Sequence, residues 1–261
     1  MRAMRIIDLS GKTGLVLGVA NQRSLAWAIA EALNGAGARL AFTYQGERLE
    51  ESVRSLASGC AGSIVLPCDV TSEAELDAVF TTLEREFGRL DYLVHSIAYA
   101  RKEDLDGAFH QTPREGWRMA LDISAYSLVA LAGRAVPLMK DGGGSMITLT
   151  YLASHRVFPN YNVMGSAKAA LEHAVRRLAF ELGEMNIRVN AISAGPVSTL
   201  SARGISGFTS MVGHARKKAP LGRSIEAREV ADAALFLLSP MGSGITGTTL
   251  YVDAGYHIMG I

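Results

Sequence analysis

Two side chains on one predicted helix could do acid–base chemistry together. Tyr161 stands at the start of residues 160–185, a long stretch with helical periodicity, and Lys168 follows seven residues later. Seven residues return a helix to within about 20° of its starting direction, so both side chains should share a face. A lysine ammonium near a phenol lowers the pKa of the tyrosine and can also hydrogen-bond a ribose. Because such a pair usually lies on a surface, it indicates catalysis only beside a cofactor site.

A cofactor site is predicted at the turn between residues 13–19, a short β-branched apolar run, and the helix expected at residues 24–34. The pyrophosphate of a dinucleotide needs free backbone N–H groups, an approach without a Cβ atom and the positive end of a helix. Gly18 meets the second need, and Ser24, a candidate N-cap, could donate its hydroxyl to phosphate. The usual dinucleotide-binding fingerprint has three glycines, and the later ones are missing here. The turn alone therefore fits an ordinary strand–helix connection equally well.

Polar residues after the next two predicted strands fit the rest of a dinucleotide. Gln45, at the end of the second strand, could hydrogen-bond the ribose 2′-hydroxyl, where many NAD enzymes place an acid. Arg48 could instead pair with a 2′-phosphate, although Glu47 beside it would oppose one. Asp69, after the third strand, could accept a hydrogen bond from the adenine amine, cap the next helix, or do both.

The order of the predicted elements indicates the fold. Short apolar runs alternate with helical stretches along the chain, which implies right-handed crossovers and a parallel sheet. We therefore predict an α/β fold with a doubly wound (Rossmann-type) parallel sheet of about seven strands, helices on both faces, and a single domain over residues 1–261. The predicted strands are residues 13–19, 39–44, 63–67, 90–96, 145–150, 188–193 and 248–253. The predicted helices are residues 24–34, 46–56, 72–87, 113–139 (bent before Pro137), 160–185 and 224–239.

Residues 196–220 stand apart, because they are rich in Ser, Thr and Gly and have weak helical periodicity. So long a segment inside a compact domain is usually disordered or functional. It leaves the carboxyl end of a predicted strand, where ligands of doubly wound sheets bind, so we predict a substrate lid. The segment holds five basic residues and no acidic one, Arg203, His214, Arg216, Lys217 and Lys218, which could dock an acidic partner or form an ordinary solvated turn.

Composition narrows the function classes. A formal net charge of +1 provides no global field for nucleic acid or an anionic membrane. The two cysteines, Cys60 and Cys68, are too few for a disulfide framework and fit a reducing, cytoplasmic compartment. Charged residues interrupt the basic N-terminus, and no stretch approaches the roughly 20 apolar residues of a membrane span. The six histidines show no metal-ligand spacing, so we predict no metal site.

Several motifs together carry a family resemblance from end to end. They are PNYNVMGSAK at residues 159–168, FTYQ at 42–45, HSIA at 95–98, DIS at 122–124 and RVNAISAGP at 188–196. On these motifs the chain resembles the short-chain dehydrogenase/reductase superfamily, and within it the bacterial NADH-dependent enoyl-[acyl-carrier-protein] reductases. Carbonyl-reducing members carry the tyrosine four residues before the lysine, where this chain has Met164, and a serine about thirteen residues before that tyrosine, where it has Tyr151.

The shifted tyrosine suits reduction of a C=C bond. In an enoyl thioester the hydride goes to C3, while negative charge develops on the thioester oxygen two bonds further away. Three additional residues correspond to about 4.5 Å of helical rise, which moves the phenol away from the nicotinamide in the required direction. A carbonyl or alcohol dehydrogenase and a non-enzymatic dinucleotide sensor remain the rival hypotheses, although a sensor needs no proton donor.

The resemblance implies an activity, a cofactor and a set of site residues. The activity is reduction of the trans-2 double bond of enoyl-acyl-carrier-protein thioesters by NADH, in fatty acid biosynthesis. Tyr161, Lys168 and Tyr151 would be catalytic, and Ala100 would touch substrate. The NADH/NAD⁺ site would comprise Gly18, Ser24, Leu25, Gln45, Asp69, Val70, Ile97, Lys168, Val197, Ser198, Thr199, Leu200 and Ser201. The implied partners are an acidic acyl carrier protein and further copies of the chain in a homotetramer.

Overall fold

A parallel sheet forms the centre of the molecule. The computed structural model describes residues 7–197, 199 and 206–260. Within this part of the chain, seven strands pair in the order β3-β2-β1-β4-β5-β6-β7, and every pair is parallel. Their bounds are β1 Thr13–Leu17, β2 Arg39–Tyr44, β3 Ile64–Pro67, β4 Tyr92–His95, β5 Gly144–Thr150, β6 Ile187–Ala194 and β7 Thr249–Val252. The predicted doubly wound α/β fold is confirmed.

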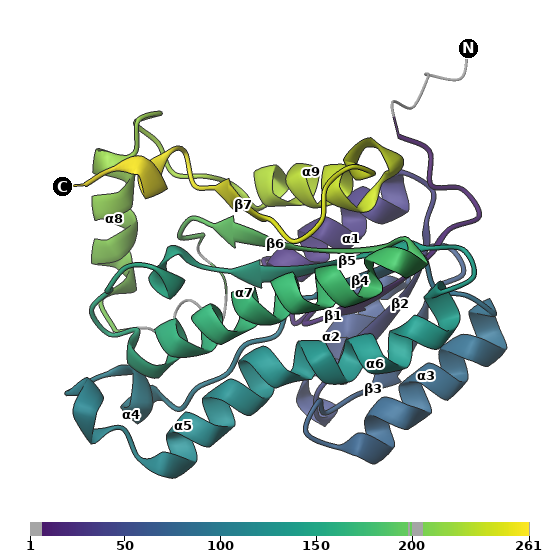
Figure 1. Cartoon of the computed structure of the whole chain (residues 1–261), viewed down its shortest axis with the longest axis horizontal. Helices are drawn as coiled ribbons and strands as arrows, with labels where there is room; N and C mark the ends of the chain where they lie inside the picture. The colour runs from purple at the N-terminus through teal and green to yellow at the C-terminus, as the bar shows by residue number, and fades with distance from the viewer. Residues whose placement is uncertain (1–6, 198, 200–205, 261) are drawn as a thin grey trace.

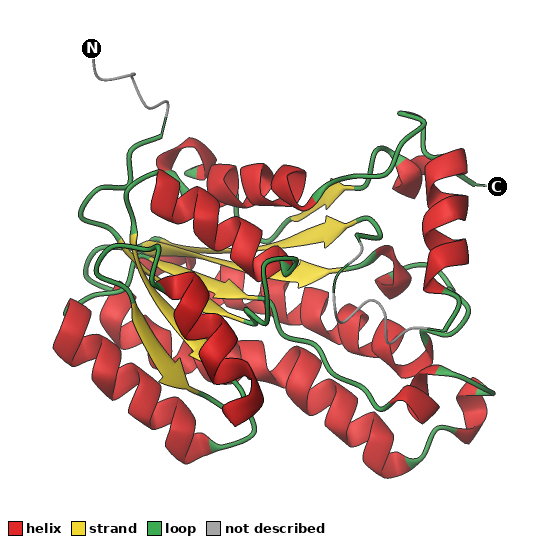
Figure 2. Cartoon of the chain, turned by 180° about the vertical axis from the view of Figure 1, so that it is seen from behind, coloured by secondary structure: helices red, strands yellow, loops and turns green. Residues whose placement is uncertain are grey.

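Helices cover both faces of the sheet (Figures 1 and 2). One layer comprises α1 (Leu25–Gly35), α2 (Glu47–Ala57) and α9 (Ala227–Leu238). The opposite layer comprises α3 (Glu73–Phe87), α6 (Ser127–Met139) and α7 (Asn162–Leu182). The strands are buried on both sides: Val16 and Phe42 face the first layer, whereas Leu15 and Leu93 face the second, and all four are fully buried. Strands that are buried on both faces consist of consecutive apolar residues, which is why they were recognisable in the sequence.

The predicted helix over residues 113–139 is interrupted at a different place from the one expected. It consists of α5 (Arg114–Leu121), a π-helical turn at Asp122–Tyr126 and α6, with Pro137 inside α6. The buried Ser124 of this turn hydrogen-bonds both backbone groups of Tyr99, accepting from its N–H and donating to its carbonyl. The irregular turn therefore attaches the long helix to the loop that follows β4, and Pro137 is not the main irregularity.

The same run, Arg114–Met139, is long and apolar enough by length and composition to cross a membrane. Half of its most apolar window is buried inside the protein, as in the core helix of a soluble protein, so the finding is weak evidence for a span. The sequence analysis did not anticipate any such stretch.

Two further helices lie at the carboxyl end of the sheet. They are α4 (Lys102–Leu105), after β4, and α8 (Phe208–Lys218), after β6. Most of the described part of residues 196–220 is thus helical, more regular than its weak periodicity indicated. In Figure 1, α8 stands beside the C-terminal segment, at the end of the molecule where α7 begins.

Candidate functional site

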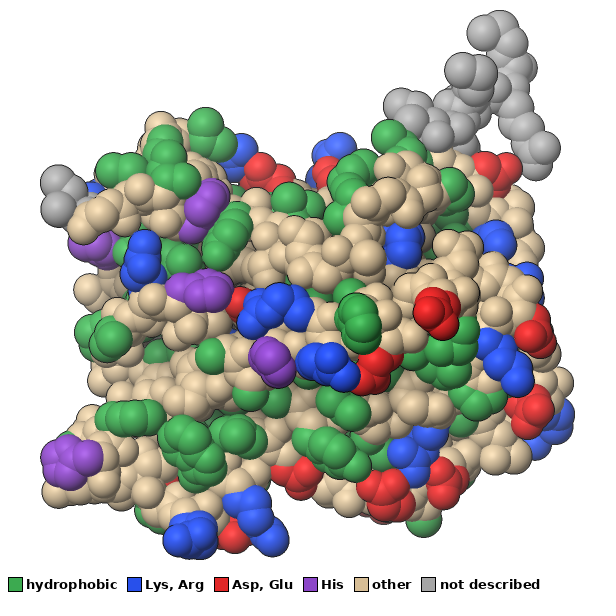
Figure 3. Space-filling model, in the orientation of Figure 1, with side chains coloured by type: hydrophobic (Ala, Val, Ile, Leu, Met, Phe, Trp, Pro, Cys, Tyr) green, Lys and Arg blue, Asp and Glu red, His purple; other side chains and the backbone are tan. Residues whose placement is uncertain are grey.

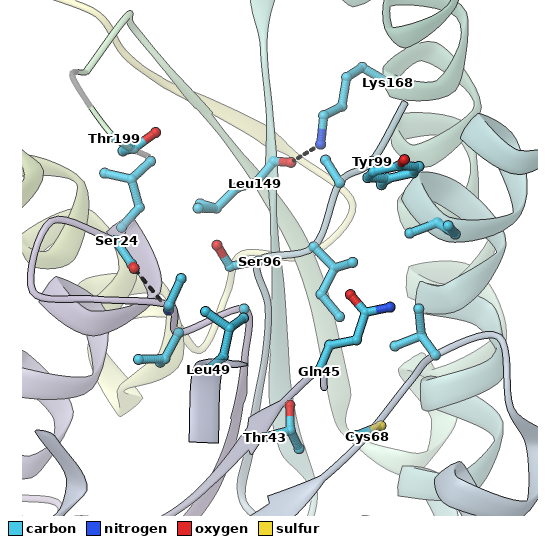
Figure 4. Close-up of a pocket in the computed structure, with 18 residues that line it drawn as sticks. Ser24, Thr43, Gln45, Leu49, Cys68, Ser96, Tyr99, Leu149, Lys168 and Thr199 are labelled. Carbon is cyan, nitrogen blue, oxygen red and sulfur yellow. Dashed lines mark hydrogen bonds between the residues drawn. The ribbon is translucent and has the colours of Figure 1, made fainter. Parts of the chain in front are cut away.

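Two adjoining cavities open at the carboxyl edge of the sheet. One has a volume of about 540 Å³ and is lined by the ends of β1, β2 and β4 and by the start of α1. The other has a volume of about 480 Å³ and is lined by the ends of β5 and β6, the start of α7 and the first half of α8. Both reach Leu149, Lys168 and Thr199, so a ligand in the first cavity can meet a ligand in the second. Figure 4 shows the first cavity, with Lys168 reaching in from α7.

Gly18 permits the close approach that shapes the first cavity. Its φ is +95°, a conformation that side chains rarely adopt. A Cβ atom there would lie 2.0 Å from the Ser96 carbonyl oxygen, so any other residue would force the turn after β1 away from the loop after β4. The glycine is therefore required where the order of the strands reverses, the point at which nucleotides bind to open α/β sheets.

Ser24 is placed as predicted, but its side chain has another partner. It is the N-cap of α1 by backbone position, yet its hydroxyl forms no bond to the helix. Instead the hydroxyl accepts from the N–H groups of Ala20 and Asn21, each at 3.0 Å, and donates to the Asn21 carbonyl. Ser24 thus stabilises the turn that lacks the later glycines, while the first N–H groups of α1 have no intrahelical partner. Such a helix start suits a phosphate.

Gln45 and Asp69 form one polar unit at the end of β2. The Gln45 amide donates to the Asp69 carboxylate at 2.9 Å. Partial burial acts to raise the pKa of Asp69, but hydrogen bonds from Thr71 and Gln45 outweigh it and hold that pKa below its usual value. Asp69 does not cap the next helix, because Ser72 does so by accepting from the Glu75 N–H. Of the two predicted roles for Asp69, the helix-capping role is wrong.

The catalytic candidates meet in the second cavity. Tyr151, Tyr161 and Lys168 all line it, and the two tyrosine rings lie edge to face with centroids 5.3 Å apart. Tyr161 is the N-cap of α7, just before the helix begins. Gly165 lets α7 lie close to the turn after Tyr151, since a Cβ atom there would be 3.0 Å from the Ala153 carbonyl oxygen.

The protonation of these groups differs from the prediction. Burial raises the pKa of Tyr161, and no lowering by Lys168 is found, so the predicted lowering is wrong for this structure. Burial also raises the pKa of Tyr151 and lowers that of Lys168 to about 8, although the charge of Glu172 opposes the latter change. The Lys168 ammonium donates to the Leu149 carbonyl at 2.8 Å, which points it between the cavities (Figure 4). Both phenols are therefore protonated at neutral pH and can donate hydrogen bonds.

The structure brings most of the predicted site residues together. The first cavity is lined by Gly18, Ser24, Leu25, Gln45, Val70, Ile97, Lys168 and Thr199. The second is lined by Ala100, Tyr151, Tyr161, Lys168 and Val197. Asp69 is attached to this set through Gln45. Ser198, Leu200 and Ser201 lie outside the described residues, as does Arg203 of the predicted lid.

Several lining residues were not predicted. Tyr99 lines both cavities and is half exposed, and Ile123 of the π-helical turn reaches the first cavity. Phe208 and Met211 of α8 form one wall of the second cavity, and Met211 accepts a hydrogen bond from the Tyr151 hydroxyl. The only sequence signal for these residues was their position, beside the quoted motifs at 95–98 and 122–124 or inside the predicted lid.

Metal ligands do not gather in this structure: among the described residues no group of three or more His, Cys, Asp or Glu side chains could hold an ion. One buried histidine, His95, lies beneath the cavities between Thr148 and Ser127, at 2.7 and 2.8 Å. Burial and the nearby Lys168 charge lower its pKa to about 3, so it is neutral.

Comparison with known proteins identifies close relatives. The sequence model of a family described as enoyl-(acyl carrier protein) reductase matches residues 18–257. The enoyl-[acyl-carrier-protein] reductase [NADH] FabI of Bacillus cereus is 52% identical over 254 residues, which is 97% of this chain and 99% of that protein. The enzyme of the same name from Nostoc is 50% identical over 259 residues, covering 98% of this chain and all of that protein.

Solved structures agree with these relatives. The Bacillus cereus enoyl-acyl carrier protein reductase, in complex with NADP⁺ and indole naphthyridinone, superimposes with a TM-score of 0.95 at 52% identity, covering 98% of this chain and 100% of that chain. The Aquifex aeolicus enoyl-[acyl-carrier-protein] reductase (NADH) superimposes with a TM-score of 0.94 at 47% identity, covering 97% of this chain and 99% of that chain. The likeness therefore extends over the whole fold, including both cavities.

Proposed function

The chain belongs to the enoyl-(acyl carrier protein) reductase family, and from this membership we infer that it reduces the trans-2 double bond of enoyl-acyl-carrier-protein thioesters with NADH. This reaction belongs to the elongation cycle of fatty acid biosynthesis. The observation that carries the inference within the structure is the meeting of the two cavities at Lys168, with Tyr161 in the second. A cofactor and an acyl substrate can thus be held next to each other beside a phenol.

The first cavity fits a dinucleotide. Gly18 removes the Cβ atom where the pyrophosphate must approach, and the open start of α1 supplies N–H groups. The Gln45 carbonyl remains available to accept from a ribose hydroxyl, because its amide nitrogen is the group that donates to Asp69. When bound, NADH supplies the hydride that adds to C3 of the enoyl thioester. We assign the thirteen predicted cofactor residues to this site, with Val197 and Thr199 beside the nicotinamide.

Tyr161 is the proposed donor to the thioester oxygen. Negative charge develops on that oxygen as the hydride adds, and a preorganised donor stabilises it by about 3 kcal/mol. Burial raises the pKa of the phenol and so keeps it protonated. Tyr151, whose ring contacts Tyr161 and whose hydroxyl is bound to Met211, orients the acyl group, and Ala100 contacts it.

Lys168 is the proposed ribose ligand. Its ammonium carries three donors and uses one on the Leu149 carbonyl, so two remain for ribose hydroxyls. Met164, which stands where a carbonyl reductase carries its acid tyrosine, lines the second cavity and has no proton to give. The geometry therefore favours C=C reduction over the rival ketone reduction.

The proposed lid is residues 196–220, and its described end is fixed to the body of the protein. The Ser206 hydroxyl donates to the Asp106 carboxylate at 2.8 Å, and the Asn160 amide donates to the Ser206 carbonyl at 2.9 Å. These bonds hold the start of α8 next to Tyr161, so that Phe208 and Met211 face the second cavity. Movement of this segment would open the acyl cavity to solvent.

The proposed protein partner surface is the end of α8. Arg216, Lys217 and Lys218 are exposed there, in the last turn of the helix whose first half forms a wall of the acyl cavity. An acidic acyl carrier protein could place its attached substrate at this cavity while its charge is matched by these cations. We also propose a cytoplasmic location, in keeping with the two free cysteines, both buried.

A homotetramer is proposed from the exposed apolar side chains of the π-helical turn, α6 and α7. Phe180 is 76% exposed, and Tyr126 and Val129 are 53% and 39% exposed. Figure 3 shows hydrophobic side chains between charged ones on this face. We propose that these exposed apolar side chains are covered by further copies of the chain.

A substrate panel tests the proposed function. NADH oxidation is followed with a short enoyl-CoA, with the matching 3-oxoacyl-CoA and, in parallel, with NADPH in place of NADH. We expect turnover with enoyl-CoA and NADH, and lower kcat/KM with NADPH, since Glu47 opposes a 2′-phosphate. Turnover with 3-oxoacyl-CoA alone would establish the carbonyl reductase instead, and binding of NADH without any turnover would indicate a sensor.

A further inference from the structure

One buried carboxylate behind the site has no role in the reaction as described so far. Glu172 lies four residues after Lys168 on α7, so the two side chains point from the same face of the helix. Glu172 is 2% exposed and Lys168 is 5% exposed. Burying either charge alone is costly, so a buried glutamate this close to a buried lysine needs an explanation.

The carboxylate is held by groups from other elements. The Thr150 hydroxyl, at the end of β5, donates to one oxygen at 2.7 Å. His155, just after the turn that follows Tyr151, is half exposed and places Nε2 2.8 Å from the other oxygen, which accepts no hydrogen bond from the described residues. Tyr251 on β7 lies close enough for the Glu172 charge to contribute to the raised pKa of its phenol. The bond from Thr150 fixes where the carboxylate lies.

The Lys168 ammonium has no equally strong partner. Its hydrogen bond goes to the Leu149 carbonyl, a neutral group one residue before Thr150. Tyr151 and Tyr161 share its cavity, but burial raises the pKa of both, so neither supplies negative charge. His95, on β4, is neutral as well. The opposite charge that acts on Lys168 is therefore that of Glu172, through space along α7.

We propose that Glu172 is a positioning residue that keeps Lys168 protonated and, through Thr150, fixes the strand end that carries Leu149 and Tyr151. The carboxylate contacts neither cavity and acts through these two neighbours. This inference rests on the proposed function, in which the charged Lys168 binds the ribose of NADH.

Loss of the charge should appear in the pH dependence. Burial has already lowered the pKa of Lys168 to about 8, and Glu172 opposes that change. Replacing the carboxylate by a neutral group should lower this pKa further, by about one unit for charges one helical turn apart. Lys168 would then lose its proton as the pH rises through about 7 instead of about 8. At acidic pH it stays charged, so the effect should vanish there.

The experiment uses Glu172→Gln in the full-length enzyme, since glutamine still accepts the Thr150 hydroxyl. NADH affinity, from fluorescence titration, and kcat/KM for NADH, which reports the free enzyme, are measured from pH 5.5 to 9. We expect wild-type values at the acidic end, NADH binding that is about three- to fivefold weaker near pH 8, and an alkaline limb of the pH profile moved to lower pH by about one unit. Glu181→Gln is the matched control, because Glu181 lies on the same helix, is 51% exposed and pairs with Arg177.

The pH dependence distinguishes a positioning role of Glu172 from a purely structural role. An equal loss of NADH affinity at every pH would overturn the proposal and leave Glu172 a structural residue. An unchanged alkaline limb of the kcat/KM profile would do the same. If Glu172→Gln does not fold, Glu172→Asp serves instead: it keeps the charge, so the limb should stay in place while kcat falls, and a moved limb would overturn the proposal. A wild-type enzyme that binds NADH but reduces no enoyl thioester would contradict the proposed function, whereas the NADH affinity profile would still test Glu172.

Discussion

Burial has opposite consequences for the two residues that the sequence paired, Tyr161 and Lys168. It disfavours the charged form of each, so the phenol holds its proton more tightly and the ammonium holds its proton less tightly. A protonated phenol is the form that can donate to a developing enolate oxygen, and a charged lysine is the form that can stabilise a bound ribose. The site therefore depends on a phenol that is secure in its protonation and a lysine that is close to losing its proton.

Lys168→Met tests the proposed binding of ribose by Lys168 without changing the Tyr161 phenol. The methionine is similar in length but carries no donor, and it leaves the buried Glu172 carboxylate without an opposite charge, so the melting temperature should be lower. NADH should bind about tenfold more weakly, because a charge-assisted hydrogen bond contributes about 1.5–3 kcal/mol. Isothermal titration with NADH measures the effect. Unchanged affinity would remove the ribose role of Lys168.

At the scale of elements, the sequence predicted those whose pattern is local. The strands and the layered helices follow from apolar runs and periodicity, and they lie within a few residues of the predicted bounds. The π-helical turn at Asp122–Tyr126 was missed because its cause is a tertiary hydrogen bond between Ser124 and Tyr99, far apart in the sequence. Helix α8 was underestimated because its position depends on contacts of Ser206 with Asp106 and Asn160.

Helix α8 carries the prediction for the protein partner. Reversing Arg216, Lys217 and Lys218 to glutamate should raise KM for carrier-protein-bound substrate about tenfold or more, with a much smaller effect on the matching enoyl-CoA. Salt should weaken the wild-type preference, since exposed charges are screened. Steady-state kinetics on both substrates at two ionic strengths measure this.

The control reverses Arg85 and Lys140, exposed cations at the C-terminal ends of α3 and α6, near the amino edge of the sheet. It should change neither KM. Equal losses on both substrates in the α8 variant would point to damage of the acyl cavity, and no loss on either would leave these cations as ordinary surface.

For the whole molecule, fold and site location followed from the sequence, whereas the detailed electrostatics did not. The alternation of predicted strands and helices, the position of Gly18 and the family resemblance together placed a cofactor site at the carboxyl edge, because doubly wound sheets bind ligands there. The bond between Gln45 and Asp69, the turn built on Ser24 and the raised pKa of Tyr161 depend on distances and burial that no spacing encodes. A sequence pattern shows which residues are neighbours along the chain. These features depend instead on how the folded chain places and buries each side chain, so the pattern could not predict them.

The assembly carries its own prediction. Phe180→Glu should break the proposed homotetramer into smaller species, because a charge would be buried at an apolar interface. Light scattering after size exclusion measures the mass. Leu221→Glu, at a residue 62% exposed on a loop away from α6 and α7, should leave the mass unchanged. A wild-type monomer, or a Phe180→Glu variant of unchanged mass, would remove this face as the interface.

The central claim is that the Tyr161 hydroxyl stabilises the thioester oxygen while NADH is held elsewhere. Tyr161→Phe tests it most directly, because it deletes one oxygen atom from a partly buried ring that lines the second cavity and leaves the first cavity untouched. In single-turnover kinetics with a short enoyl-CoA, we predict that the rate falls by about a hundredfold or more, equivalent to about 3 kcal/mol, with the NADH dissociation constant unchanged. A rate within tenfold of the wild type would contradict the account.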